Sequence, residues 1–289
     1  MRNLIRVTLL FACIPGMMAC SEDHSSTFPV VKSDFIRFVP QGDASGCLET
    51  ALVSYENREG YRVDLIAAVH LADAGYFEQL QFLFSCYDAL LYEMVAPHGV
   101  IPRKGEEGGS MLSWFQRAFC RGLDLEFQLD AINYAEDNFV HADLTPGEFI
   151  DLWEKKGESL FGMIFKILSA QSKAMEQGVE FELTPAAMLE ALLHEDSARR
   201  LKFLLAREFK NIEFLLASLD SGKEGEESVL LGERNKAALA VLKRQLRAGK
   251  KRLALYYGAG HMPDLELRLQ RDLGFERTGQ MWLTAWNMP

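Results

Sequence analysis

The sequence lacks the patterns that identify several common sites. Its five cysteines include no C-x-x-C pair, which excludes a zinc ribbon and a thioredoxin-type motif. It contains no phosphate-binding P-loop and no G-x-S-x-G nucleophile elbow. His194 and Glu195 begin an H-E-x-x-H metal motif, but Ala198 stands where the second histidine would be. Any catalytic site must therefore be assembled from residues far apart in the chain.

Outside the N-terminal leader of residues 1–20, the chain has only three cysteines: Cys47, Cys86 and Cys120. Cys47 and Cys120 could form a disulfide in an oxidising compartment, which the sequence alone leaves open. Cys86 falls on an apolar helical pattern, so we expect it to be a buried thiol.

The N-terminal apolar run is too short to form a stable transmembrane helix. Arg2 and Arg6 precede the apolar residues 7–14, and this order is typical of a secretory signal over residues 1–20. We therefore expect an exported protein.

Cys20 follows a small residue, which resembles a bacterial lipobox. That resemblance implies cleavage before Cys20, lipidation of its thiol and attachment to a lipid bilayer; an ordinary cleaved signal is the alternative. Ser21 resembles outer-membrane sorting in a cell with two membranes, with the protein facing the periplasm. We expect residues 21–33 to be a flexible tether and residues 34–289 to form a single domain.

Positive charge is in the minority. Loss of Arg2 and Arg6 with the leader would take the formal net charge from −10 to −12. Such an acidic chain is a poor candidate for binding nucleic acid or anionic lipid through its surface.

In the N-terminal third, short runs that are typical of strands are separated by turn residues, with a hairpin at residues 57–60. A strand, a helix and a second strand then follow within a short span, which is typical of a parallel βαβ unit. We therefore expect an α/β fold with a mixed, largely parallel central sheet flanked by helices. The predicted strands are 35–39, 50–55, 61–69 and 89–95, and the predicted helix is 73–84.

The middle of the chain, about residues 111–220, predicts a mostly helical insert. Thr145-Pro146 and Thr184-Pro185 are helix starts, each with a capping threonine before proline. Residues 160–168 are unusually apolar, and they form either a core helix or a face for a partner or a membrane. The pattern then predicts a helix at 231–246, a strand at 252–257, a helix at 265–273 and a strand at 281–286.

One strand runs directly into glycines and a histidine, in the sequence LALYYGAGHMP of residues 253–263. A dinucleotide-binding turn would need a third glycine at 263, where the chain has Pro263. Gly258 and Gly260 would instead let the backbone turn tightly and bring His261 towards the end of the sheet.

His70, Glu93 and His261 each follow a predicted strand. If these strands are parallel, their carboxyl ends share one rim, and two imidazoles and a carboxylate converge there. That set could hold a divalent transition metal with open positions for water and substrate. Glu93 within an apolar run also needs a cation or hydrogen-bond donors. The simpler alternatives are solvated histidines and a Glu93 that pairs with a core arginine.

Four short motifs in this order resemble the TraB/PrgY/GumN family, which is related to the TIKI proteins. The resemblance covers roughly residues 50–289, and Ala67 stands where the family usually has glycine. Residues 122–126 and 140–143 also match the family loosely. The four motifs are Ala67-Ala68-Val69-His70, Leu91-Tyr92-Glu93-Met94, Gly232-Glu233-Arg234-Asn235 and Gly258-Ala259-Gly260-His261.

The resemblance implies an α/β core of the kind found in erythromycin esterase-like and haem-binding lipoproteins. In TIKI relatives it implies a metal-dependent peptidase, with His70, Glu93 and His261 as candidate ligands or catalytic groups. Arg234 is a candidate for stabilising an oxyanion or holding a substrate carboxylate, or it pairs with Glu93 or Asp143. Glu126 is a candidate base or supporting group.

Three functional hypotheses follow. The first is a cell-envelope metal-dependent hydrolase that acts on a peptide or ester bond. The second is a lipoprotein that binds haem, a small ligand or a peptide without turnover. The third is an interaction protein or homo-oligomer that uses the apolar segment 161–168.

Overall fold

The structure is a computed structural model, and it describes residues 35–42, 45–102, 122–176, 178–179, 181, 183–217 and 227–289. Residues 32–289 belong to one compact unit. The expected signal of residues 1–20, the lipidation site Cys20, the tether of residues 21–33 and Cys120 lie outside the described residues.

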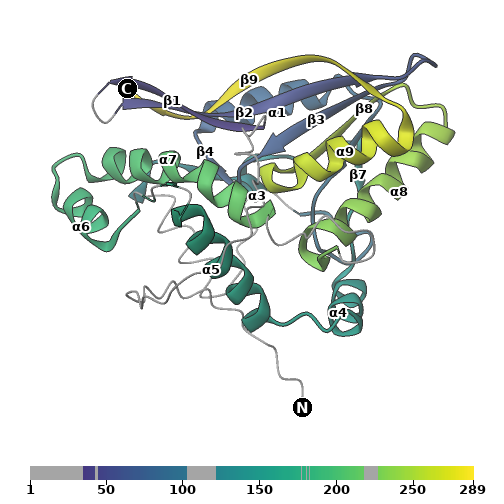
Figure 1. Ribbon diagram of the computed structural model, residues 1–289. Coiled ribbons are helices and arrows are strands. Elements are labelled where there is room, and N and C mark those ends of the chain that lie inside the picture. The colour runs from purple at the N-terminus through teal and green to yellow at the C-terminus, as the bar shows by residue number, and fades with distance from the viewer. Residues whose placement is uncertain are drawn as a thin grey trace. The chain divides into compact units, whose positions relative to one another are not determined.

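A mixed sheet of seven strands and flanking helices confirms the expected α/β fold (Figure 1). Four neighbouring strands, in the order β3-β8-β5-β7, are parallel. Strand β2 is antiparallel to β9 along one edge, and to β1 and then β3 along the other. The strands are β1 (Ile36–Gly42), β2 (Ser45–Glu56), β3 (Arg62–Ala68), β5 (Ala89–Tyr92), β7 (Phe139–His141), β8 (Arg252–Gly258) and β9 (Glu276–Met288).

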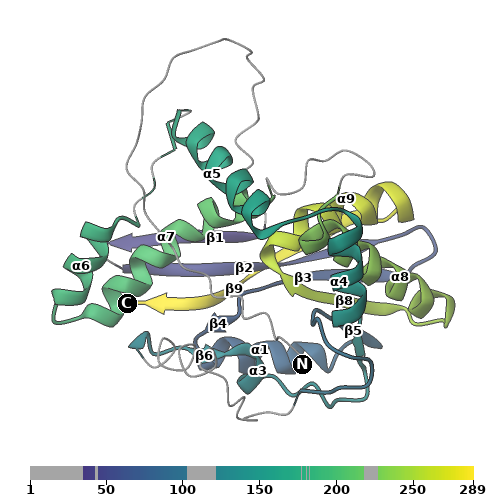
Figure 2. The ribbon, with the colours of Figure 1, turned by 90° about the horizontal axis from the view of Figure 1, so that it is seen from below.

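Helices cover both faces of the sheet. In Figure 2, α1 and α3 lie on one side of the strands, and α8 and α9 lie on the other. A small two-stranded sheet pairs β4 (Leu71–Ala72) with β6 (Glu126–Phe127). The helices are α1 (Ala74–Phe84), α3 (Gln128–Ala131), α4 (Pro146–Lys155), α5 (Leu160–Glu176), α6 (Pro185–Leu193), α7 (Ser197–Ala217), α8 (Arg234–Arg247) and α9 (Met262–Leu273), with a π-helical turn at Val229–Glu233 and a 3-10 turn at Ala259–His261.

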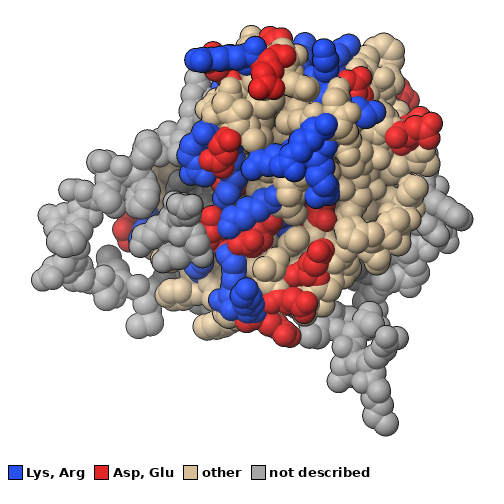
Figure 3. Space-filling model, turned by 90° about the vertical axis from the view of Figure 1, so that its right-hand side faces the viewer, with Lys and Arg blue, Asp and Glu red and all other residues tan. Residues whose placement is uncertain are grey.

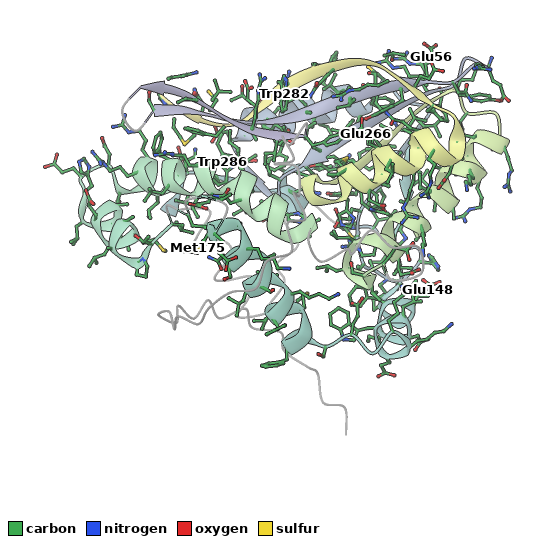
Figure 4. The ribbon with its side chains drawn as sticks, in the orientation of Figure 1. Glu56, Glu148, Met175, Glu266, Trp282 and Trp286 are labelled. Carbon is green, nitrogen blue, oxygen red and sulfur yellow. The ribbon has the colours of Figure 1, made fainter. Side chains whose placement is uncertain are left out.

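The core lies on both faces of β8, because neighbouring side chains of a strand point to opposite faces. Tyr256 packs against Phe84 of α1, with ring centroids 4.8 Å apart. Tyr257, on the other face, packs edge-on against His261 at 5.3 Å. Farther along the sheet, Trp286 of β9, labelled in Figure 4, packs edge-on against Phe209 of α7 at 5.1 Å.

Local sequence signals set several helix ends. Thr145 and Glu148 form a capping box at the start of α4. The Thr184 side chain accepts a hydrogen bond from the Ala187 N–H at the start of α6. Gly274, with φ +66, ends α9 in the left-handed conformation that glycine adopts at little cost.

Some boundaries and environments differ from the sequence predictions. The strand predicted at 89–95 ends at Tyr92, and within 111–220 the strands β6 and β7 precede α4. The expectation of a buried Cys86 is wrong, because this thiol is exposed. The apolar segment at 160–168 is not a core helix, since several of its side chains are exposed.

Candidate active site

The carboxyl ends of the four parallel strands share one rim of the sheet. Ala68 of β3 is the register partner of Gly258 of β8, and Tyr92 of β5 is the partner of both Tyr256 and His141. The strand order therefore places the residues that follow β3, β8, β5 and β7 next to one another. These residues include the three expected metal ligands His70, Glu93 and His261, and also Asp143.

Glu93 receives hydrogen bonds at both carboxylate oxygens. The guanidinium Nη2 of Arg234 donates to Oε1 at 2.6 Å, and the backbone N–H of Gly258 donates to Oε2 at 2.6 Å. A Cβ atom at position 258 would lie 3.3 Å from Oε2, so glycine allows this close approach. The imidazole Nε2 of His261 lies 3.4 Å from Oε1.

Arg234 joins the two carboxylates of the site. Its Nη2 donates to Asp143 Oδ2 at 2.6 Å, and its Nε donates to Asp143 Oδ1 at 3.0 Å. The sequence left open whether Arg234 pairs with Glu93 or with Asp143. In the structure it pairs with both. Two carboxylates face one guanidinium, so the three groups carry a net charge of about −1.

Asn235 fixes the orientation of the His261 ring. The Asn235 Nδ2 donates to the carboxylate of Asp264 at 2.8 Å, so its Oδ1 is the atom that faces His261. The His261 Nδ1 lies 2.7 Å from that oxygen and therefore carries a proton. This leaves Nε2 directed at Glu93 and at Arg234 Nη1, which is 3.4 Å away.

The site is buried, and charge determines the pKa values within it. Burial would raise the pKa of Glu93, but the charge and hydrogen bond of His261, followed by the charges of Arg234 and His70, hold it well below its usual value. Burial would lower the pKa of Arg234, but hydrogen bonds and charge from Asp143 and Glu93 raise it instead. Both groups are therefore charged near neutral pH.

His70 lies at the outer side of this group. Its side chain is exposed, and its charge contributes to the lowered pKa of Glu93, which requires the two residues to be near each other. Its backbone carbonyl accepts a hydrogen bond from the Gln128 N–H at 2.9 Å, which ties the segment after β3 to α3.

Glu126 does not join the Glu93 cluster. It is exposed on β6 and lines a hollow of about 540 Å³ together with residues of α1, such as Glu78, and residues near β7, such as Glu136. His141 also faces elsewhere, because its Nε2 contacts the carbonyl of Met94 at 2.5 Å. A role for Glu126 as a base at the rim has no support from this placement.

The rim provides two side chains with the spacing of metal ligands. Ligands at about 2.1 Å from one tetrahedral ion are separated by about 3.4 Å, which is the distance between His261 Nε2 and Glu93 Oε1. Within the described residues, however, no three His, Cys, Asp or Glu side chains lie close enough to hold a metal ion. Any third ligand, such as His70, would have to move inward.

Two supporting residues were missed at the sequence level. The sequence predicts no role for Asn235 beyond its place in a motif, and none for Asp264. The available signal was the place of Asn235 next to Arg234 in the motif Gly232–Asn235, at the start of α8. Asp264 sits three residues after His261, in the first turn of α9.

No family model, curated protein or solved structure matches this chain. The TraB/PrgY/GumN resemblance therefore stays a sequence-based expectation. In the described part of the chain, every helix is too short or too polar to cross a membrane. Cys47 is buried, and Cys120, with which it could pair, lies outside the described residues, so the pairing stays an open question.

The surface charge is mixed on the face shown in Figure 3. Lys and Arg side chains gather there, with Asp and Glu side chains among them. The expectation that the protein does not bind nucleic acid stays a prediction.

Proposed function

We propose that this protein is a cell-envelope hydrolase that depends on a divalent metal ion and acts on a peptide or ester bond. One observation carries the proposal: His261 Nε2 and Glu93 Oε1 lie 3.4 Å apart, and the proton on Nδ1 is fixed by Asn235. A histidine whose other nitrogen donates to an oriented oxygen is the usual arrangement of a metal ligand.

The donor set fits a divalent transition ion. Imidazole and carboxylate are ligands that zinc and its neighbours accept, and the net charge of about −1 on Glu93, Asp143 and Arg234 favours a cation. The guanidinium of Arg234 opposes a cation, but Asp143 neutralises it through the hydrogen bonds it accepts from Nε and Nη2. His261 and Glu93 would hold the ion, with the exposed His70 as a third ligand.

A bound ion would polarise the substrate carbonyl and lower the pKa of a bound water. Residues of this chain would hold the ligands in place and contact the substrate. Asn235 holds the ring of His261, and Gly258 holds the carboxylate of Glu93. Among the described residues, the Arg234 Nη1 contacts only His261 Nε2 and the Leu230 carbonyl, both at 3.4 Å, so it is the donor best placed to approach a substrate oxygen.

The haem-binding alternative has less support. His261 is 4% exposed, and its Nε2 faces Glu93 and Arg234, so a porphyrin would have to displace both side chains to reach it. His70 is the exposed histidine of the rim and would have to serve as the axial ligand. An absorbance spectrum after haem addition tests this alternative directly.

Metal analysis of the purified full chain tests the proposal. We expect about one divalent ion per chain in the wild type. The variants His261→Ala and Glu93→Gln should lose both the ion and hydrolysis of a peptide library and a simple aryl ester. His194→Ala, which changes an exposed histidine on the insert, should keep both. Full hydrolysis by the folded His261→Ala protein would contradict the assignment.

A further inference from the structure

Two arginines line a hollow between helices α6 and α7 of the insert. The two helices pack against each other and lie side by side in Figures 1 and 2. The hollow has a volume of about 360 Å³, which is within the range of small-molecule sites. None of the described residues that line it belongs to the candidate active site, so the hollow is a separate feature of the molecule.

The spacing of the lining residues explains the shape of the hollow. Ala187, Glu190 and Ala191 are three or four positions apart, so they share one face of α6. The two alanines leave room between the helices, because their side chains end at Cβ. On the α7 side, Phe203 and Leu204 provide an apolar wall. The hollow therefore offers apolar surface next to its charged groups.

The positive charge of the hollow is only partly balanced. The side chain of Arg200 has no hydrogen bond or ion pair with any described residue, and its Nε is buried. The Nε of Arg199 is also buried without a partner, while its Nη1 donates to the Pro289 carbonyl at 2.8 Å. The Arg199 Nη2 pairs with Asp196 at 3.2 Å, but that carboxylate is 61% exposed, so the pair is weak. Two arginines and the exposed Glu190 give the described lining a formal net charge of +1.

The place of the two arginines on α7 increases the positive potential. Arg199 and Arg200 are the third and fourth residues of this helix, whose first turn contains no acidic residue. The N-terminal end of a helix carries a partial positive charge, so two cations there are unfavourable unless an anion lies near them. Helix stability therefore does not explain the pair. A buried polar atom without a partner instead points to an ion, a water or a ligand.

We propose that the hollow binds a small anionic amphiphile. Its carboxylate or phosphate would contact Arg199 and Arg200, and its apolar part would lie on Phe203 and Leu204. Arginine suits either head group, because its fork of N–H donors matches two oxygen atoms. A neutral ligand would leave Arg200 without a partner, and an inorganic anion would leave the apolar wall without a contact. The proposal does not rest on the hydrolase, so either can fail while the other stands.

Binding of octanoate to the full chain tests the proposal. Octanamide has nearly the same size but no charge, and inorganic phosphate has charge but no apolar part. Octyl phosphate carries the other head group. Isothermal titration calorimetry would measure the affinity of each probe. We expect octanoate to saturate one site per chain and to bind at least about 10-fold more tightly than octanamide, because it accepts charge-assisted hydrogen bonds. Whichever of octanoate and octyl phosphate binds more tightly identifies the preferred head group, and either result supports the proposal.

Three variants locate the site. Arg200→Ala should weaken octanoate binding about 10- to 100-fold and leave octanamide binding unchanged. Arg58→Ala, which changes an exposed arginine in the turn between β2 and β3, is the matched control and should change neither. Ala187→Leu fills the hollow without changing its charge, so it should weaken octanoate and octyl phosphate alike. Thermal unfolding of each variant would show that it is folded.

Several results would overturn the proposal. Equal affinities for octanoate and octanamide would show that charge is not recognised. Inorganic phosphate that binds as tightly as octanoate would show that the apolar wall contributes nothing. Unchanged octanoate binding in the folded Arg200→Ala and Ala187→Leu proteins would place the ligand elsewhere. If neither octanoate nor octyl phosphate saturates a site, the hollow holds only solvent.

Discussion

Replacing Asp143 with alanine removes the acid that neutralises Arg234. The Asp143 side chain has no exposed surface, and Arg234 is only 8% exposed, so water cannot compensate for the lost partner. Three hydrogen bonds from Arg234 would be lost, and one from the Leu144 N–H. Removing one partner of a buried pair costs about 3–5 kcal/mol, because an uncompensated charge stays inside the protein. Glu93 keeps one bond to Arg234, which favours the lower end of that range.

Urea unfolding at neutral pH measures this loss directly, as a shift in midpoint at constant slope. In a thermal scan the same loss should lower the melting temperature by on the order of 10 °C. Asp272→Ala is the matched control, because that carboxylate pairs with Arg271 at the surface and should cost less than about 1 kcal/mol. If Asp143→Ala loses no more stability than Asp272→Ala, the buried pair is not what holds the rim together.

Three further changes test the rim. Since the pKa of Glu93 is lowered from 4.5, its charge stabilises the fold above that pH and is lost as the pH falls. The metal-free Glu93→Gln protein should therefore lose less stability than wild type between about pH 5 and pH 3, as melting temperatures at each pH would show. Asn235→Ala should weaken metal affinity about 10- to 100-fold, measured by competition with a chelating dye; unchanged affinity would exclude its positioning role. Gly258→Ala places a Cβ 3.3 Å from Glu93 Oε2 and should cost about 1–3 kcal/mol in urea unfolding. Gly279→Ala, whose nearest contact is 4.0 Å away, should change stability little.

The long elements of the fold could be predicted because their patterns are local. The apolar run of β8 and the threonine-proline start of α4 each contain enough information within a few residues. The short strands β4 and β6 could not be predicted, because a strand of two residues shows no periodicity. Each of them is a strand only because it pairs with the other. The early end of β5 at Tyr92 has a similar cause, because the next residue, Glu93, turns to reach Arg234 and Gly258.

The rim could be predicted in outline, because strand ends in a parallel sheet meet at one edge. The sequence could not choose between the partners of Arg234, since a buried guanidinium accepts any nearby carboxylate. The structure uses both Glu93 and Asp143. The contact of Asn235 with His261 and Asp264 depends on how the starts of α8 and α9 pack, and no local pattern encodes it.

The charge balance of the rim connects its stability to its proposed chemistry. Glu93 and Asp143 share the guanidinium of Arg234, so one more positive charge is needed to balance the two carboxylates, and His261 Nε2 lies 3.4 Å from Glu93 Oε1. The missing positive charge has one well-placed position, His261 Nε2, which faces Glu93 while Asn235 occupies the other ring nitrogen. Either a proton or a metal ion can supply that charge there. The two compete for one atom, so metal uptake should release protons, and the release should disappear in His261→Ala. A simple buried ion pair would bind no metal and release none.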